Sequence, residues 1–382
     1  MTIGTRRQKS RISGFILLIV AVCTFAVLIK NPDIAIGYMR QGLRLCAETV
    51  IPSLFPFMVL SGLFVELGVA DLFSRFLSVP MRFLFGISGE GSAAPLMGAL
   101  CGFPVGAATA HRLCESGRIS RAEMSRLLAF SNNPSSAFLI SAVGSALWSC
   151  PRFGVVLYVV QLLASLLIGV ALRFIYPIEK NDAVKSEISH SMPGVRIFTR
   201  VVSESAISML NVCALVLFFA SMVGALISML EGLGIGQTAK TMIYGFFEMS
   251  GAVGEGAKVL PRETGLILTA LICGWSGLSV HFQVISICIS DGVSFAPYFA
   301  AKGIQGIFSA FAMLFYIKFI DKTLPSICIP ALAADLSEKG NTALAVMANA
   351  VLIIGLLICF FKRLFKCRPR SSPQGRKDSK RP

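Results

Sequence analysis

Residues 127–144 read LLAFSNNPSSAFLISAVG, an apolar stretch whose centre holds two asparagines, three serines and a proline. Residues 268–285 read LTALICGWSGLSVHFQVI and keep the same hydropathy profile with little identity. Both lie in apolar segments of about 20 residues, the length that an α-helix needs to cross ~30 Å of hydrocarbon. We therefore expect one membrane helix with a polar interruption in each half of the chain.

The composition also indicates a membrane protein. Hydrophobic residues make up 55% of the 382 residues and charged residues only 14%, whereas soluble domains carry about 25% charged residues. So few charges cannot cover the surface of a water-soluble protein of this length. We therefore predict an integral protein of the cell membrane and exclude a cytosolic enzyme, a nucleic-acid-binding domain and a disordered protein.

The net charge of +15 is concentrated at the two ends of the sequence. Residues 1–11 contain four basic and no acidic residues, and residues 362–382 contain nine basic residues and one acid, Asp378. Basic clusters beside apolar spans are typical of the cytoplasmic side of a membrane, where they also attract anionic lipid. We expect both ends to be cytoplasmic and to contact membrane lipid rather than nucleic acid.

Apolar segments recur along the chain and predict about eight transmembrane helices. The segments are 12–29, 50–67, 127–148, 153–176, 205–230, 265–290, 296–320 and 343–361. The first exceeds the 7–15 apolar residues of a signal peptide, so we interpret it as a retained span. An even number of spans agrees with two basic ends on one side.

Two further apolar stretches, 87–110 and 241–258, are interrupted by glycines. A basic loop follows the first stretch, so that stretch must enter and leave the membrane on the cytoplasmic side if 50–67 returns the chain there. This describes a re-entrant hairpin, whose non-helical backbone is tolerated only inside protein or beside a water-filled cavity. The alternative is an ordinary glycine-containing helix packed closely against its neighbours.

The hydrophilic segment 177–203 divides the chain into two similar halves. Each half has an apolar span, a glycine-broken stretch, a span with a polar interruption and a further span, and the count of spans gives the halves opposite orientations. Residues 30–44 are expected to form an external loop, although their basic residues run against the positive-inside rule.

The predicted organisation is a tail and first span at 1–30, a first repeat at 40–176, a cytoplasmic linker at 177–203, a second repeat at 204–320, a final span at 343–361 and a basic cytoplasmic tail at 362–382. The fold class is therefore an all-α polytopic membrane protein with two inverted repeats, an arrangement in which paired broken helices mark a transporter's midplane site.

The first polar interruption offers neutral hydrogen-bonding groups at membrane depth. Pro134 removes one backbone donor and opens the helix, which leaves N–H and C=O groups that need partners. We consider two interpretations, a solute site and a kink satisfied by its own side chains. The candidate solute contacts are Asn132, Asn133, Ser135 and Ser136.

The second interruption has a different set of side chains. A histidine on an apolar helix is more often a packing residue than a ligand, but the neighbouring hydroxyls make either role open for His281. Trp275 either stacks on a planar solute or lies at the membrane interface. The candidate contacts here are Trp275, Ser276, Ser279, His281 and Gln283.

Acidic residues at membrane depth are costly and usually line a pathway or pair with a base. Glu248 lies between Phe247 and Met249 in the second glycine-broken stretch, so we predict an ion-coupling role for it. Glu255 and Lys258, three residues apart, either take part in the site or neutralise each other.

Eleven cysteines and three histidines do not predict a disulfide framework or a metal centre. The cysteines form no C-x-x-C pair, most lie in apolar runs, and the histidines are far apart in the sequence. Motifs of nucleotide-driven enzymes, metalloproteases and serine hydrolases are absent from the sequence. We expect no structural metal, no cofactor and no enzymatic activity.

Glycines and a proline surround a turn in the first glycine-broken stretch, at CGFPVGA (101–107). Glycine allows close approach of the backbone and exposes N–H groups to an anion. We interpret this turn as a hairpin tip. Its candidate solute contacts are Gly102, Phe103, Pro104 and Gly106.

CGFPVGA, LLAFSNNPSSAFLISAVG, FFEMSGAVGEGAK and GWSGLSVHFQV, in this order, resemble the sporulation integral membrane protein YlbJ family. That family carries the nucleoside-recognition, or Gate, domain related to concentrative nucleoside transporters, and the resemblance covers about residues 40–320. It implies a transporter-like protein of endospore-forming bacteria that delivers dipicolinic acid, a small aromatic dicarboxylate, across the outer forespore membrane.

The resemblance also implies roles for particular positions. SNNPSS and GWSGLS would be the two broken-helix sites, and CGFPVGA and FFEMSG the two hairpin tips. Family members often have a lysine after the GFPVGA run, where this chain has Ala108. His111 or Lys258 is then expected to supply the missing cation.

The leading hypothesis is a secondary transporter for a small, anionic, aromatic solute, with a proton or a sodium ion as coupling ion. The alternatives are a non-transporting scaffold or assembly factor for spore formation and a nucleoside transporter. An intramembrane hydrolase is disfavoured because no nucleophile–base pair can be placed from the sequence. The oligomeric state stays open.

The topology predicts which engineered cysteines an impermeant thiol reagent reaches from outside intact cells. A cysteine at position 330 should be labelled, because loop 321–342 lies on the external side. Cysteines at positions 185 and 375 should be protected in the cytoplasmic linker and tail. Equal labelling at 185 and 330 would contradict this topology.

Overall fold

A computed structural model describes residues 32–67, 69–178, 194–230, 234–288 and 292–321, together with Phe25, Ile29 and Lys30. These residues form helices and no strands, so the predicted all-α class is confirmed for this part of the chain. Among the described residues, four helical segments are long and apolar enough to cross a membrane, at Pro151–Ile175, Val195–Met229, Arg262–Cys288 and Ala296–Ile320. The predicted spans at 12–29 and 343–361, loop 321–342 beyond Asp321 and the tail at 362–382 lie outside the described residues.

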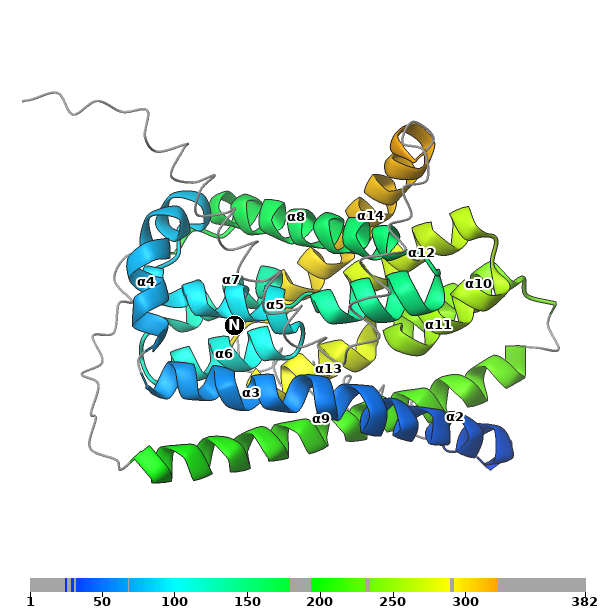
Figure 1. Ribbon diagram of the computed structural model, residues 1–382, viewed down its shortest axis with the longest axis horizontal. Coiled ribbons are helices and arrows are strands. Elements are labelled where there is room, and N and C mark those ends of the chain that lie inside the picture. Colours follow the sequence, from blue (N-terminus) through cyan, green and yellow to red (C-terminus); the bar gives the residue numbers. More distant parts are fainter. Residues whose placement is uncertain are drawn as a thin grey trace, which may run out of the picture. The chain divides into compact units, whose positions relative to one another are not determined.

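The first described segment is one long helix, which corrects the prediction of a loop at 30–44. Helix α2 (Pro32–Leu45) continues through the π-helical segment η1 (Cys46–Val50) into α3 (Ile51–Glu66), because the junction residues Leu45 and Val50 keep right-handed helical dihedrals. Figure 1 shows α2 and α3 running beside α9 (Gly194–Leu230). Buried Gly42 faces Ala220 and Leu217 of α9, while Arg40 and Arg44 are exposed. The basic residues that ran against an external loop therefore occupy the exposed side of a helix.

Helix α9 also begins earlier than expected, at Gly194, so the last ten residues of the segment 177–203 are helical. Its first turns carry Arg200, which pairs with Glu66 at the end of α3 at 2.6 Å and with Glu204 at 3.8 Å. These ion pairs account for charged residues on a helix that continues into an apolar span.

The remaining elements repeat one order in the two halves: a helical hairpin, a broken helix and a long apolar helix. In the first half, α4 (Val69–Pro80), η2 (Met81–Phe85) and η3 (Gly89–Ser92) precede α5 (Ala93–Cys101), α6 (Val105–Glu115), α7 (Arg121–Ser131), η4 (Phe138–Leu147) and α8 (Pro151–Ile175). In the second half, α10 (Gln237–Phe247), α11 (Met249–Val259), α12 (Arg262–Trp275) and α13 (Gly277–Cys288) precede α14 (Ala296–Phe315) and η8 (Tyr316–Ile320). The helix breaks fall in the two polar interruptions read from the sequence.

Helix α14 shows how the chain distributes polarity. Its buried face carries Lys302, Gln305 and Ser309, whereas exposed Ile304 and Phe311 lie on the opposite face. A soluble amphipathic helix has the reverse arrangement, with apolar residues facing the core. Polar residues that face the interior and apolar residues that face outward are the pattern expected of a helix surrounded by lipid.

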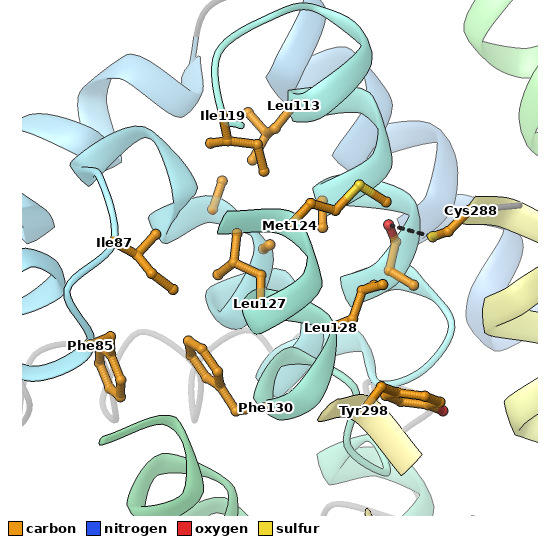
Figure 2. Packing of buried hydrophobic residues seen from close by; sticks show 14 of the residues in the cluster. Phe85, Ile87, Leu113, Ile119, Met124, Leu127, Leu128, Phe130, Cys288 and Tyr298 are labelled. Carbon is orange, nitrogen blue, oxygen red and sulfur yellow. Dashed lines mark hydrogen bonds between the residues drawn. The ribbon is translucent and has the colours of Figure 1, made fainter. Parts of the chain in front are cut away.

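The apolar core packs around α7, whose start is fixed by a capping box. Ser120 Oγ accepts a hydrogen bond from the Glu123 N–H at 3.2 Å, and Glu123 accepts one from the Ser120 N–H at 3.0 Å. Figure 2 shows Phe130 of α7 against Phe85, with ring centroids 4.9 Å apart. The same cluster includes Cys288 of α13, so it joins elements of both halves.

Two glycines let the first hairpin close around the end of α7. A Cβ atom added at Gly98 of α5 or at Gly106 of α6 would overlap the carbonyl oxygen of Ser131. The two glycines therefore lie next to each other, and both lie against the carbonyl of the last residue of α7. This close approach positions the hairpin against the first helix break.

We predict that Gly98→Ala destabilises the protein, because the added Cβ would force α5 away from α7. The cost of such overpacking is about 1–3 kcal/mol of unfolding free energy. Gly303→Ala on α14 is the matched control, since nothing lies within 4 Å of a Cβ added there. Thermal unfolding of the purified proteins in detergent measures both, and equal midpoints for the two variants would contradict the packing argument.

Candidate functional site

The first helix break leaves backbone carbonyls that find partners from several elements. Pro134 has no N–H to give to Phe130 O, and the side-chain amide of Asn133 donates to that oxygen instead, at 3.0 Å. The Asn132 amide donates to Leu128 O at 2.9 Å. The carbonyl of Asn133 accepts from the N–H of Phe103 at 2.9 Å, which ties the break to the tip of the first hairpin.

Gly102 makes this tip contact sterically feasible. Its φ of +83° is a conformation that side-chain-bearing residues rarely adopt. A Cβ there would also lie 2.6 Å from the backbone nitrogen of Ser135. On the far side of the break, Ser135 Oγ accepts from the Phe138 N–H at 3.1 Å and so caps the continuing helix. The predicted tip and the predicted break thus form one local structure.

A lysine from the second half enters the first break. Lys302 of α14 is fully buried, and its ammonium donates to the carbonyl oxygen of Asn132. It also lies 3.0 Å from Gln305 Oε1 and 3.5 Å from Asn133 Oδ1. Within the described residues, no carboxylate forms an ion pair with Lys302. Its three donors therefore have three neutral oxygens as partners and no compensating charge.

Two glutamines extend this polar cluster to both halves. Gln305 donates to Asn133 Oδ1 at 2.9 Å and to Gln161 Oε1 of α8 at 3.0 Å. Gln161 in turn donates to Ala270 O of α12 at 2.8 Å. In each half the glutamine is followed four residues later by a buried serine, Ser165 in α8 and Ser309 in α14. The long apolar helices α8 and α14 thus share a Gln-x-x-x-Ser pattern, and both residues of the pattern are buried in each helix.

The second break is shorter and is made by backbone conformation. Ser276 and Gly277 both have φ of +76°, so α12 ends at Trp275 and α13 begins immediately afterwards. The indole N–H of Trp275 donates to Phe246 O at 3.0 Å, near the tip of the second hairpin. A Cβ at Gly277 would lie 3.1 Å from Met249 N. Each half therefore packs a hairpin tip against its own broken helix.

Aromatic rings surround the start of α13. His281 lies edge-on to Trp275, with centroids 4.4 Å apart, and its Nδ1 is 2.9 Å from the hydroxyl of Tyr298. Tyr298 is one turn before Lys302 on α14. His281 Nε2 and Asn132 Oδ1 are buried atoms that have no hydrogen-bond partner among the described residues.

Glu248 forms the tip of the second hairpin. It is buried, and its carboxylate oxygens accept from the N–H groups of Ser250 at 2.8 Å and Gly251 at 2.6 Å. It therefore caps the N-terminus of α11, where the helix dipole favours a negative charge. The ion-coupling role predicted for Glu248 stays a prediction, and the cap explains how its buried carboxyl group is satisfied by backbone N–H groups.

The remaining candidates divide into those near the breaks and those elsewhere. Gln283 and Ser279 are buried and hydrogen-bond to each other at 3.4 Å, whereas Ser136 is half-buried. Lys258 pairs with Glu255 at 3.0 Å on an exposed surface, in agreement with mutual neutralisation. His111 lies 3.8 Å from Glu115. In the part of the chain that the structure describes, no group of His, Cys, Asp or Glu is arranged to hold a metal ion.

Sequence reasoning missed Lys302, Gln305 and Gln161. Their signal was present, since each is a polar residue inside an apolar span, and such residues mark functional positions in membrane proteins. The cation predicted from the resemblance was instead His111 or Lys258. The structure places the buried ammonium at the first break from a helix 170 residues further along the chain.

Comparison with known proteins finds a matching family model and a related protein. Residues 47–147 match the family model described as "Gate: Nucleoside recognition". The predicted resemblance is confirmed. The chain is also 27% identical over 332 residues to the sporulation integral membrane protein YlbJ of Bacillus subtilis, covering 76% of this chain and 80% of that protein. No solved structure matches the chain.

Proposed function

We propose that the protein is a secondary transporter that moves a small, anionic, aromatic solute of the dipicolinate type across the outer forespore membrane during sporulation. The observation that carries this proposal is the pairing, in each half, of a hairpin tip with a broken helix from the same half. Paired broken helices in opposed repeats form the midplane sites of secondary transporters. The similarity to a sporulation membrane protein supports the biological setting.

The lengths of the hairpin helices support re-entrant hairpins. Helices α5, α6, α10 and α11 have 9, 11, 11 and 11 residues. At 1.5 Å per residue they extend about 14–17 Å, roughly half of the ~30 Å hydrocarbon core. Each hairpin therefore enters to the middle of the membrane and returns. With about eight full spans, this gives two inverted repeats.

The charges and rings near the breaks favour an anionic aromatic solute. The uncompensated charge of Lys302 attracts an anion, and the unpartnered His281 Nε2 and Asn132 Oδ1 offer polar contacts. Trp275 supplies an aromatic face beside His281. A planar ring carrying carboxylates matches this combination of groups better than an apolar solute does.

A nucleoside is the second candidate solute, because the match at residues 47–147 is to a nucleoside-recognition domain. The two breaks carry amides and hydroxyls that suit a neutral, hydroxyl-bearing solute. A buried ammonium without a carboxylate partner gives a neutral solute no advantage, which is why we place the nucleoside second.

Uptake into proteoliposomes of the purified full chain tests the function. We expect saturable uptake of labelled dipicolinate and little uptake of labelled nucleosides. Asn132→Ala and Asn133→Ala should each reduce uptake about tenfold or more, because they remove polar groups at the break. Absence of saturable flux of any of these solutes, with folding shown by a cooperative thermal transition, would contradict the proposal and favour a membrane scaffold.

Glu248 is proposed to carry the coupling proton, since it is a buried acid at a hairpin tip. We expect Glu248→Gln to fold, to bind solute and to lose the pH dependence of uptake. Glu255→Gln on the same helix is the matched control, because Glu255 is exposed and paired with Lys258. Uptake measured across external pH 5–8 distinguishes them. An unchanged pH profile in Glu248→Gln would leave this residue with the capping role alone.

A further inference from the structure

We propose that Lys302 is a tethered cation that fills a sodium-type site at the first helix break, so that transport needs no sodium ion. This inference rests on the proposed transport function and adds to it the identity of one coupling site. The observations that carry it are the chemistry of the three oxygens around the ammonium and their place at the end of a half-helix.

The oxygens around Lys302 are those that bind an alkali cation in transporters. Asn132 O is a carbonyl at the end of α7, and Asn133 Oδ1 and Gln305 Oε1 are amide oxygens. Carbonyls of unwound segments and the C-terminal ends of half-helices coordinate sodium ions in secondary transporters. The partial negative charge at the C-terminus of α7 adds to the attraction. An ammonium with three donors and no acceptor satisfies this set in place of a metal ion.

The surroundings of Lys302 argue against an ordinary salt bridge. The titratable side chain nearest to it along α14 is Tyr298, and α13 contributes His281, which is 2.9 Å from the Tyr298 hydroxyl. The break after α7 and the helix α8 contribute neutral partners, Asn133 and Gln161, to the cluster. A lysine that served only to balance an acid would be expected beside a carboxylate. Here the ammonium instead connects the second half to the break of the first half.

The tether has a consequence for coupling. A free sodium ion can leave when a transporter reorients, whereas a lysine remains attached to α14 throughout the cycle. The basic group is then a permanent part of the site. It favours an anionic solute in every cycle and leaves the proton, carried elsewhere, as the coupling ion.

Sodium rescue of a lysine deletion tests this inference. Labelled dipicolinate uptake is measured in proteoliposomes of the full chain in sodium chloride and in choline chloride. The wild-type protein should transport equally in both. Lys302→Ala should lose uptake at least about tenfold in choline and regain several-fold in sodium, because a sodium ion can occupy the vacated oxygens. Lys302→Met, which fills the space with an uncharged side chain, should be inactive in both.

Thermal unfolding supplies a readout that does not depend on transport. Sodium should raise the unfolding midpoint of Lys302→Ala relative to choline, and should not raise that of the wild type or of Lys302→Met. Lys318→Ala is the matched control, because Lys318 is exposed on the continuation of the same helix. It should behave as the wild type in both assays.

The outcomes separate this inference from the proposed function. A wild-type protein that transports only in sodium would overturn the tethered cation, as would full uptake by Lys302→Ala in choline. The tethered cation would also be overturned if sodium changed neither the uptake nor the unfolding midpoint of Lys302→Ala. If the wild type transports none of the solutes while sodium selectively stabilises Lys302→Ala, the transport function fails and the cation site stands.

Discussion

The structure depends on how a helix broken inside a membrane satisfies its exposed backbone groups. A buried carbonyl or N–H without a partner costs several kcal/mol where water is absent. The break after Ser131 meets this demand with groups from three places: its own asparagine side chains, the backbone of the first hairpin and the lysine of α14. Each partner is thereby fixed in position. The requirement for backbone satisfaction assembles the site.

The two halves meet the same requirement with different chemistry. The first break is a non-helical stretch of several residues that starts with Asn132 and Asn133. The side chain of Lys302, from the other half, donates a hydrogen bond to this stretch. The second is confined to Ser276 and Gly277, whose left-handed conformations turn the chain within a single step. The wider break gathers more polar side chains than the second one does. Equivalent topology thus allows the two breaks to differ in function.

The residue types within a few positions of each other predicted both the first helix break and the tip of the first hairpin. Pro134 between asparagines and serines identified the first break, and the glycines around Phe103 identified a hairpin tip, because both signals act within a few residues. The helix at 32–45 was missed because the segment lies between two predicted spans and was interpreted as the loop that joins them, whereas its buried Gly42 packs on α9. The role of Lys302 could not be read from spacing, since its partner Asn132 is 170 residues away. Only the tertiary packing of α14 against α7 brings the two together.

The contacts at the breaks also differ in kind. Within the first half, the hairpin tip is joined to the break by a backbone hydrogen bond from Phe103 to Asn133. Between the halves, the polar contacts of Lys302, Gln305 and Gln161 all involve side chains. Side-chain hydrogen bonds can be exchanged by rotation, whereas a tip-to-break backbone bond requires its helices to move together. One half rocking against the other would therefore carry the first hairpin with its own broken helix and exchange partners in the cluster around Lys302.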